Sequence, residues 1–259
     1  MTIAFFKYQG TGNDFVMIDN RDGTINLSQP QIARLCHRQF GIGADGLMEL
    51  TLVPDYDFGM VYYNADGHLG SMCGNGGRCI TQFAYDIGIK KSEYHFLASD
   101  GAHQSRITPH RWVQLGMQPV HSIERHTNYD FLNTGSPHVV KTVVEVSLYN
   151  VVAEGRSIRN HENWQPHGVN VNFVEVLQPS HIFVRTYERG VENETLSCGT
   201  GVTAAALVNA HNARGFNHVD ITTLGGKLYV QYDQIADDKF ENIILCGPAT
   251  QVFSGSVVL

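Results

Sequence analysis

One glycine-rich cysteine motif occurs twice in this chain, and the repeat limits the possible folds more than any other feature. The first copy is residues 71–79 (SMCGNGGRC), and the second copy is residues 196–201 (LSCGTG). In each copy a cysteine precedes a glycine-rich turn, and a helical pattern follows the turn. A chain that carries the motif twice is expected to build the same local structure twice.

Other blocks repeat in the same order along the chain. The repeated blocks, each with its counterpart, are 10–16 with 133–139, 41–49 with 168–175, 71–79 with 196–201, and 116–120 with 247–252. The offset between counterparts is nearly constant, from 123 between Gly12 and Gly135 to 131 between Gly116 and Gly247. Self-similarity at a fixed offset indicates a duplicated unit. We therefore predict two homologous lobes.

The repeat also predicts where the lobes begin and end. The N-terminal lobe is expected to consist of residues 1–118, to carry Cys73, and to be completed by a C-terminal strand at residues 250–259. The C-terminal lobe is expected to consist of residues 119–249 and to carry Cys198.

Each lobe is expected to place short strands around a central helix. Residues 58–63 and 181–187 are rich in β-branched and aromatic side chains, which predicts strands that lead toward the cysteine turns. After Cys73, apolar residues recur at helical spacing until Gly88. Residues 202–210 are apolar almost all round, which is typical of a helix buried in a core. The predicted fold class is α/β (α+β), with two pseudo-symmetric lobes.

Composition indicates a globular protein and argues against several functional classes. The 259 residues are 42% hydrophobic and 17% charged, which is typical of a soluble domain with a good core. A net charge of −7 and an isoelectric point near 6.0 argue against a nucleic-acid-binding surface. No apolar run approaches the ~20 residues of a membrane helix, and residues 1–7 reach a lysine too early for a secretory signal. Five cysteines without framework spacing favour a reducing compartment, so we predict a cytoplasmic protein.

The two repeated cysteines are the strongest candidates for catalysis. A cysteine at a helix N-terminus lies beside a partial positive charge, which favours thiolate over thiol. Free amides of the same turns are a site for a carboxylate or a phosphate. The amides expected to serve in this way belong to Gly74, Asn75, Gly199 and Thr200. Two such cysteines, one in each lobe, predict chemistry in which two thiol groups face one substrate.

Several blocks taken together resemble the diaminopimelate epimerase family. These blocks are residues 6–15, 40–46 (FGIGADG), 64–67 (NADG), 72–76 (MCGNG), 168–173 (GVNVNF), and 188–190 (ERG) followed by 198–201 (CGTG). The resemblance spans the whole chain in order. It implies two α/β lobes, each a barrel-like antiparallel or mixed sheet around a central helix, with the active site in the cleft between them. It also implies cofactor-independent interconversion of LL- and meso-diaminopimelate, in lysine and peptidoglycan biosynthesis.

The resemblance further implies roles for individual residues. Cys73 and Cys198 are the implied catalytic pair, in which one thiolate removes the α-proton and the opposite thiol returns a proton to the other face. His138 and Glu188 are implied to tune the pKa values of the pair. The residues implied to bind substrate are Asn13, Asn64, Gly74, Asn75, Ser136, Asn170, Glu188, Arg189, Gly199 and Thr200. The family pattern implies no metal site and no cofactor, diaminopimelate as the small-molecule substrate, and a homodimer.

These residue types suit a substrate with two charged ends. The planar guanidinium of Arg189 is able to bind a distal carboxylate in a two-pronged geometry, while Glu188 is expected to face an ammonium group. Asparagine amides suit a zwitterion because each offers a donor and an acceptor. The chain departs from the family pattern at Ser136, where many relatives have asparagine, and at Gly46, where some have glutamine. The loop between Glu188 and Cys198 also looks one residue longer than usual.

The remaining cysteines and most other histidines are given structural roles. Cys36, Cys79 and Cys246 are predicted to pack in the core, as small buried side chains. The histidines predicted to lie on the surface are His103, His110, His121 and His126.

Three alternative functions remain open at this point. A proline or hydroxyproline racemase uses a similar fold and cysteine pair, but residues 12–15 and 64–67 and the Glu188-Arg189 pair favour the diaminopimelate enzymes. A non-catalytic amino-acid-binding protein would bind the substrate without exchanging its α-proton. A thiol redox protein is disfavoured because the chain has no Cys-x-x-Cys. If the two cysteines face each other across a narrow cleft, we expect oxidants to inactivate the protein reversibly.

Overall fold

The computed structural model describes residues 2–209 and 214–259, and these residues form two compact units. Unit 1 runs from the start of the described chain to Leu115 and resumes at Gly247, whereas unit 2 is Gly116–Cys246. The chain therefore enters unit 2 once and returns to unit 1 for its last segment.

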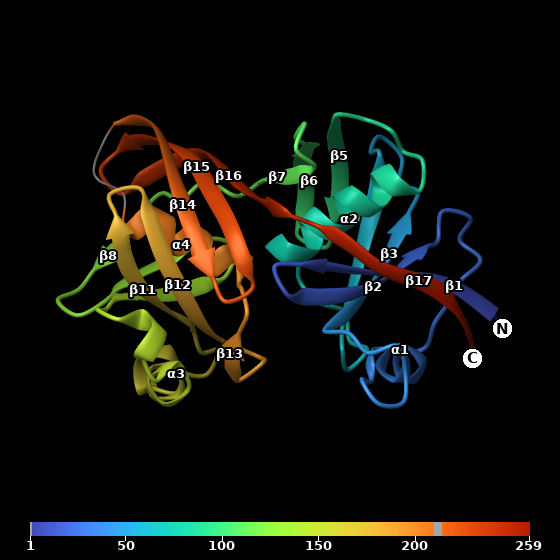
Figure 1. The fold of residues 1–259 in the computed structure, drawn as a ribbon, viewed down its shortest axis with the longest axis horizontal. Helices are drawn as coiled ribbons and strands as arrows, with labels where there is room; N and C mark the ends of the chain where they lie inside the picture. Colours follow the sequence, from blue (N-terminus) through green and yellow to red (C-terminus); the bar gives the residue numbers. More distant parts are fainter. Residues whose placement is uncertain (1, 210–213) are drawn as a thin grey trace. The chain divides into compact units, whose positions relative to one another are not determined.

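Unit 1 contains a mixed sheet and two helices among its described residues (Figure 1). Its elements are β1 (Thr2–Gly10), β2 (Asn13–Asp19), α1 (Gln29–Cys36), β3 (Gly46–Thr51), β4 (Phe58–Asn64), α2 (Gly74–Asp86), β5 (Glu93–Ala98), β6 (Gly101–Ile107), β7 (Trp112–Gly116) and β17 (Thr250–Val258). β1 pairs antiparallel with both β17 and β2, and β2 runs parallel to β3. β4 is antiparallel to β3 and parallel to β5, and β5, β6 and β7 follow one another antiparallel. Each parallel pair needs a crossover, which α1 supplies between β2 and β3 and α2 supplies between β4 and β5.

Unit 2 repeats this order of elements. Its elements are β8 (Glu124–Arg125), β9 (Asp130–Asn133), β10 (Pro137–Thr142), the 3-10 turn η1 (Val146–Leu148), α3 (Val151–Arg159), the 3-10 turn η2 (Glu162–Trp164), β11 (Asn170–Gln178), β12 (His181–Glu188), β13 (Asn193–Thr195), α4 (Gly199–Val208), β14 (Gly215–Thr223), β15 (Gly226–Ala236) and β16 (Lys239–Pro248). The short strand β13 pairs with β12, and its counterpart in unit 1 is an isolated antiparallel bridge between Tyr63 and Leu69.

The two units share one topology. In unit 2, β9 and β10 are antiparallel, β10 and β11 are parallel, β11 and β12 are antiparallel, and β12 and β14 are parallel. β14, β15 and β16 then follow antiparallel, and β8 lies beside β9 as β17 lies beside β1. The registers also correspond, because Phe15 pairs with Gly46 in unit 1 and His138 pairs with Asn170 in unit 2. The duplicated sequence therefore builds a duplicated fold, and the predicted fold class is confirmed.

A helix lies in the core of each unit, inside the curve of its sheet (Figure 1). In unit 1, α2 contacts β1, β2, β3, β6 and β17, and all its residues from Gly74 to Ala84 are buried. In unit 2, α4 contacts strands β9, β10, β11, β12, β14 and β15, and every residue from Gly201 to Val208 is buried. Because the sheet surrounds each helix, the helix N-terminus is held in a fixed place by packing on all sides.

The predicted helices begin where the sequence placed them. Both start directly after the repeated cysteines, and α2 ends at Asp86, two residues before Gly88, which has a left-handed backbone φ of +106°. α4 ends at Val208, and Ala210, the predicted end of the second helix, lies outside the described residues. The predicted strands at 58–63 and 181–187 are β4 and β12.

In the part of the chain that the structure describes, no helix has the length and apolar character needed to cross a membrane.

Removal of a large side chain from the core helix of unit 1 tests this packing. Phe83 in α2 is fully buried and its ring lies against those of Phe6 and Tyr8. We expect Phe83→Ala to lower the free energy of unfolding by about 3–5 kcal/mol, because a cavity replaces the ring. The measurement is chemical denaturation followed by fluorescence and circular dichroism. The control is Phe216→Ala on β14, where the ring is 67% exposed and the expected change is within about 0.5 kcal/mol. A loss as small as that of the control would contradict the assigned position of α2.

Candidate active site

Each of the two repeated cysteines caps the N-terminus of a core helix. Cys73 has an extended backbone, and the first bond of α2 runs from the Gly77 amide to the Cys73 carbonyl at 2.7 Å. Cys198 is also extended, and the Val202 amide donates to its carbonyl at 2.9 Å. The amides that precede these bonds have no acceptor within their own helix, and they give each N-terminus its partial positive charge. Each cysteine side chain therefore lies at a site that favours negative charge.

The Cys73 thiol belongs to a hydrogen-bond network within unit 1. Cys73 Sγ donates to Asn13 Oδ1 at 3.6 Å, and Asn75 Nδ2 donates to the same oxygen at 3.3 Å. The other end of the Asn13 amide donates to Asp45 Oδ2 at 2.7 Å. Because Asp45 accepts from the nitrogen, the amide oxygen of Asn13 must face the thiol. The structure thus brings together three of the predicted site residues: Asn13, Cys73 and Asn75.

Charged groups behind Asn13 hold this network in place. Arg38 pairs with Asp45 at 2.7 Å and with Asp14 at 2.9 Å, and Lys7 pairs with Asp14 at 2.7 Å. Burial alone would raise the pKa of Asp14, but the hydrogen bonds from Arg38 and Lys7 hold it at about 2. Asp14 is therefore ionised at neutral pH and fixes the two cations beside the β1–β2 turn.

Arg78 is a residue of this half of the site that the sequence reasoning missed. Its side chain is fully buried in α2, where it donates to Asn75 Oδ1 at 3.0 Å, to the Gly74 carbonyl at 3.1 Å and to Thr11 Oγ1 at 3.3 Å. The bond to Asn75 orients that amide so that its nitrogen faces Asn13. The available signal was an arginine inside the glycine-rich motif, on a helix predicted to be buried.

The Cys198 thiol belongs to a corresponding network within unit 2. Its Sγ lies 3.5 Å from Thr200 Oγ1, and the same hydroxyl lies 2.9 Å from His138 Nε2. Thr134 Oγ1 donates to the Thr200 carbonyl at 2.9 Å and ties the start of α4 to the turn between β9 and β10. On the other side of its ring, His138 Nδ1 lies 3.1 Å from Asn172 Nδ2. Asn172 was also missed, although it lies two residues after Asn170 and thus on the same face of β11.

A second cluster in unit 2 joins three more of the predicted residues. Asn170 Nδ2 donates to Ser136 Oγ at 2.9 Å, and Asn170 Oδ1 accepts from the Arg189 backbone amide at 2.9 Å. The Arg189 guanidinium donates to Ser136 Oγ and to the His167 carbonyl, both at 3.3 Å. Asn170 therefore positions Ser136 and Arg189, which lie on segments far apart in the sequence.

Glu188 and Asn64 end corresponding strands but have different surroundings. Glu188 closes β12, and its carboxylate accepts from Thr195 Oγ1 at 2.9 Å across the β12–β13 hairpin. Asn64 closes β4, is exposed, and begins a turn in which the Gly67 amide donates to its carbonyl at 2.9 Å.

A family model described as diaminopimelate epimerase matches residues 5–122 and 131–252 of the chain. A diaminopimelate epimerase of Flavobacterium psychrophilum is 46% identical, and the match covers 98% of this chain and 100% of the relative. This chain belongs to the diaminopimelate epimerase family. The predicted family is thereby confirmed, and with it the predicted class of enzyme, an isomerase that epimerises an amino acid.

Solved structures of lower sequence identity share the fold. A phenazine biosynthesis protein of the PhzF family from Bacillus anthracis superposes with a TM-score of 0.79 at 13% identity, over 100% of both chains. A hydroxyproline epimerase from Agrobacterium vitis superposes with a TM-score of 0.75 at 14% identity, over 100% of this chain and 93% of that one. At these identities the likeness concerns the fold alone.

One departure from the family pattern has a structural explanation. A Cβ atom at Gly46 would lie 2.5 Å from the Tyr62 ring and 2.5 Å from the Tyr63 carbonyl oxygen. Tyr62 therefore occupies the space that a side chain at position 46 would need. The ring also packs edge-on against Phe15, so this part of unit 1 is filled by aromatic groups.

The three other cysteines are buried as predicted, whereas one histidine was assigned wrongly. Burial raises the pKa of Cys36 and of Cys79 to about 12, which makes both poor thiolates, and Cys246 is fully buried. His103 was predicted to lie on the surface, but it is 6% exposed, because its ring stacks on Phe96 and bonds Asp100 at 2.8 Å. The histidines at positions 110, 121 and 126 are exposed, as predicted.

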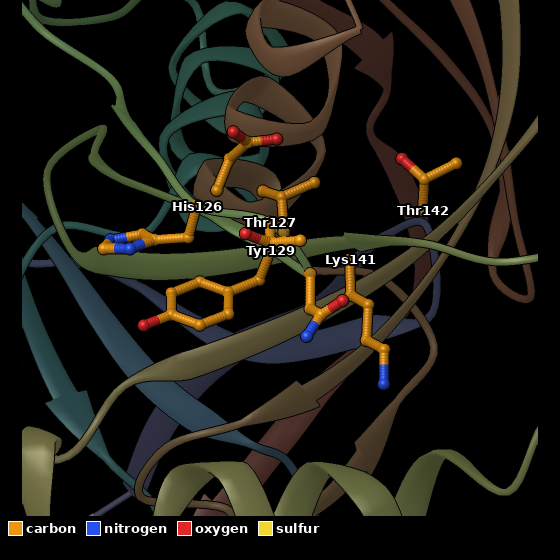
Figure 2. A pocket seen from close by; sticks show the side chains of 8 residues that line it. His126, Thr127, Tyr129, Lys141 and Thr142 are labelled. Atoms are coloured by element: carbon orange, nitrogen blue, oxygen red, sulfur yellow. The ribbon is translucent and has the colours of Figure 1, made fainter.

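A surface hollow in unit 2 is not lined by any of the predicted site residues. A surface hollow of about 400 Å3 in unit 2 lies at the end of the β9–β10 ladder opposite the turn that holds Ser136 (Figure 2). Its walls include His126 stacked on Tyr129, together with Lys141, and none of the predicted site residues lines it. Within residues 2–209 and 214–259, no cluster of three or more His, Cys, Asp or Glu side chains is arranged to hold a metal ion.

The buried imidazole of His138 predicts a pH dependence of stability. Burial, with a contribution from Arg189, lowers the pKa of His138 from its ordinary 6.5 to about 3. Below pH 6.5 the unfolded chain therefore binds a proton at His138, whereas the folded chain does not. Stability from this residue is complete above pH 6.5 and falls by about 1.4 kcal/mol per pH unit between pH 6.5 and about 3.

The test compares His138→Asn with the native chain by urea denaturation between pH 7 and pH 4. On acidification the free energy of unfolding of the variant is expected to fall less steeply, by about 1.4 kcal/mol per pH unit, because the variant lacks this titrating group. The same change at the exposed His121 serves as the control. Equal pH slopes for His138→Asn and the native chain would contradict a neutral, buried His138.

Proposed function

We propose that this chain interconverts LL- and meso-diaminopimelate by proton transfer between two thiols, Cys73 and Cys198. The observation that carries the proposal is that each cysteine caps a buried helix at the same place in a duplicated fold. Inversion of an α-carbon without an electron-withdrawing cofactor needs a base on one face and an acid on the other. Two equivalent cysteines, one in each unit, suit this symmetric task.

In the proposed reaction, one cysteine is a thiolate when substrate binds. It takes the α-proton, so that the C–H bond breaks and its electron pair stays on carbon. The other cysteine, a thiol, then donates its proton to the opposite face of the same carbon. The first sulfur ends as thiol and the second as thiolate, so the reaction balances without an external acid, base or cofactor. The mechanism requires that the two units hold the sulfurs on opposite sides of the substrate.

The helix N-termini are proposed to bind the α-carboxylate. The backbone amides proposed for this role are those of Gly74, Asn75, Gly199 and Thr200. They lie beside the reacting carbon in the proposed complex, so they would also stabilise the negative charge that the carboxylate gains as the carbanion forms. Exclusion of water from the site would strengthen these bonds.

Side chains near the strand ends are proposed to bind the distal part of the substrate. The Arg189 guanidinium is held by Ser136 and by a carbonyl, which supports a fixed fork for the distal carboxylate. Glu188 is proposed to face the ammonium group and, with His138, to tune the thiol pKa values. The other proposed contacts are the amide groups of Asn13, Asn64 and Asn170. Asn13 is already in contact with Cys73.

Replacement of either cysteine tests the two-thiol mechanism. We expect Cys73→Ala and Cys198→Ala each to lower epimerisation of LL-diaminopimelate by at least about 100-fold, because each removes one proton carrier. The assay runs in deuterated water and follows stereochemistry and α-deuterium together. Cys36→Ala is the control, since that thiol is buried and has a pKa of about 12. Unimpaired turnover by either variant would overturn the mechanism.

The same assay separates this function from the two nearest alternatives. L-Proline and trans-4-hydroxy-L-proline are offered as substrates in parallel, and no epimerisation of either is expected. Turnover of L-proline in preference to diaminopimelate would replace the proposed substrate. Binding of diaminopimelate without deuterium incorporation would indicate a non-catalytic binding protein.

Reversible oxidation offers a second test of the proposed pair. If both sulfurs approach one carbon, peroxide is expected to join Cys73 and Cys198 in a disulfide and abolish activity. Dithiothreitol is expected to restore that activity. Peptide mapping of the oxidised protein identifies the bond, and activity that peroxide leaves unchanged would count against the proposal. The need to keep both thiols reduced supports a cytoplasmic location.

Strand β17 supports the proposal that the chain forms a homodimer. Every residue from Thr250 to Val258 except Val257 is exposed, and the exposed apolar side chains include Phe253 (46%) and Val252 (56%). An exposed apolar strand at the end of a sheet is a surface that a second chain commonly covers.

The oligomeric state is measured by sedimentation velocity. Phe253→Ser is expected to shift the protein from dimer toward monomer, because it removes the largest exposed apolar group of β17. Phe216→Ser, which changes an exposed ring in unit 2, is the matched control and is expected to leave the dimer intact. A monomeric native protein would refute the homodimer.

A further inference from the structure

The turn that follows β12 in unit 2 is longer than the corresponding turn that follows β4 in unit 1. In unit 1 the Gly67 amide donates to the Asn64 carbonyl at 2.9 Å, so the bond joins residues three positions apart. In unit 2 the Glu192 amide donates to the Glu188 carbonyl at 2.9 Å, so the bond joins residues four positions apart. Arg189, which is proposed to bind the distal carboxylate of the substrate, lies inside this longer turn.

The longer turn places a glutamate in an unfavourable backbone conformation. Glu192 has a left-handed φ of +58°, and Gly190 within the same turn has a φ of +91°. Glycine adopts positive φ without a steric penalty, whereas a residue with a Cβ adopts it at a cost. A glutamate at position 192 is therefore retained in spite of its backbone, and the contacts of its side chain offset the strain.

The Glu192 carboxylate accepts hydrogen bonds from inside and outside the turn. Its Oε1 accepts from the Gly190 amide at 3.1 Å, and its Oε2 accepts from the Tyr187 hydroxyl at 3.3 Å. The Arg159 guanidinium binds the same Oε1 through Nε at 3.1 Å and Nη2 at 3.0 Å. Partial burial alone would raise the pKa of Glu192, but the bonds from Gly190 and Arg159 lower it, so the carboxylate is ionised at neutral pH.

Arg159 has a fixed position beneath a second segment of unit 2. It is the last residue of α3, where a cation interacts favourably with the helix dipole, and its side chain is only 15% exposed. A Cβ added at Gly168 would overlap the Arg159 guanidinium, so the backbone at Gly168 lies directly against that group. The Gly168 amide donates to the Trp164 carbonyl at 2.6 Å, which ties this segment to η2.

The segment above Arg159 also holds Arg189. The His167 carbonyl accepts from the Arg189 guanidinium at 3.3 Å, and Asn170 Oδ1 accepts from the Arg189 backbone amide at 2.9 Å. Arg189 is thus held by two parts of the chain, residues 188–192 on its own turn and residues 167–170. The ion pair between Glu192 and Arg159 joins these two parts.

We infer that Glu192 is a positioning residue for substrate binding, which fixes the turn of residues 188–192 on Arg159 and so aims the Arg189 guanidinium at the distal carboxylate. The inference rests on the proposed function of Arg189 and deepens it by naming the group that sets its geometry. Glu192 itself is proposed to touch no part of the substrate.

A purely structural role for the ion pair leads to a different expectation. The Glu192 side chain is 43% exposed, and an ion pair of that exposure contributes little to the stability of a protein. A positioning role predicts that the loss of Glu192 weakens substrate binding while the free energy of unfolding stays nearly native. A structural role alone predicts no effect on substrate binding in the folded protein.

The first test is the steady-state kinetics of Glu192→Asn with LL-diaminopimelate. Asparagine tolerates the left-handed backbone, but its side chain is too short to reach Arg159. The distal carboxylate does not change during proton transfer, so contacts with it stabilise substrate and transition state equally. We expect KM to rise about tenfold and kcat to stay within about twofold of the native value.

The matched control is Asp237→Asn, which breaks an exposed ion pair elsewhere in unit 2. Asp237 pairs with Arg214 at 2.9 Å and is 93% exposed. Neither kinetic constant is expected to change in this variant. Chemical denaturation of both variants checks that they are folded at the assay temperature. A native KM for Glu192→Asn would overturn the inference.

A double-mutant cycle tests whether Glu192 acts through Arg189. Arg189→Met is expected to raise KM at least about tenfold, because it removes the charged hydrogen bonds to the distal carboxylate. If Glu192 acts only by aiming that guanidinium, the double variant Glu192→Asn with Arg189→Met has the KM of Arg189→Met alone. Effects that multiply in the double variant would show that Glu192 acts by another route and would overturn the inference.

The inference and the proposed function fail in distinguishable ways. If Arg189→Met raises KM and Glu192→Asn does not, only the positioning role is wrong. If Arg189→Met leaves KM unchanged, the proposed binding of the distal carboxylate is wrong, and the positioning role is wrong with it. Titration calorimetry with diaminopimelate repeats the comparison as a dissociation constant, which needs no turnover and is independent of the two-thiol mechanism.

Discussion

The structure depends on one interaction, the contact of a cysteine with the N-terminus of a buried helix, made once in each unit. A helix surrounded by a sheet cannot move without unpacking the core, so its partial positive charge stays at a fixed point. The same geometry places amides that have no acceptor within their own helix beside a thiol, an arrangement that suits anion binding. Each unit builds this arrangement from the sequence Cys-Gly-x-Gly, because extended backbone at the cysteine turns directly into a helix at the glycine.

The duplication explains both the likeness of the two half-sites and their differences. The positions that build the turn are shared, whereas those that contact the sulfur have diverged. Asn75 corresponds to Thr200, Phe15 to His138, and Asn13 to Ser136. The proposed reaction needs one acid and one base at a time, and the two thiols have unequal surroundings. His138 and Asn172 are polar at buried positions where unit 1 has Phe15 and Met48.

Much of the fold could be predicted because the repeat and the apolar patterns are local signals. The core helices, the strands before the cysteine turns and the duplicated α/β architecture all follow from residues close together in the chain. Asn172 and Arg78 could not be predicted, because their roles depend on partners from other elements, such as Val139 and Thr11. His103 was misplaced because Phe96 meets it across the β5–β6 pair, although its other partner, Asp100, lies only three residues before it. The direction of a hydrogen bond could not be predicted from the sequence either, because it depends on the positions of all the partners.

Inversion by two thiols requires that two sulfur atoms reach one carbon from opposite sides. A crystal structure of the protein with bound diaminopimelate measures this directly. The mechanism predicts Cys73 Sγ and Cys198 Sγ on opposite faces of the α-carbon, each at about 3.5 Å, with the α-carboxylate on the amides of both helices. A complex in which either sulfur lies away from that carbon, or in which both lie on the same face, would contradict it.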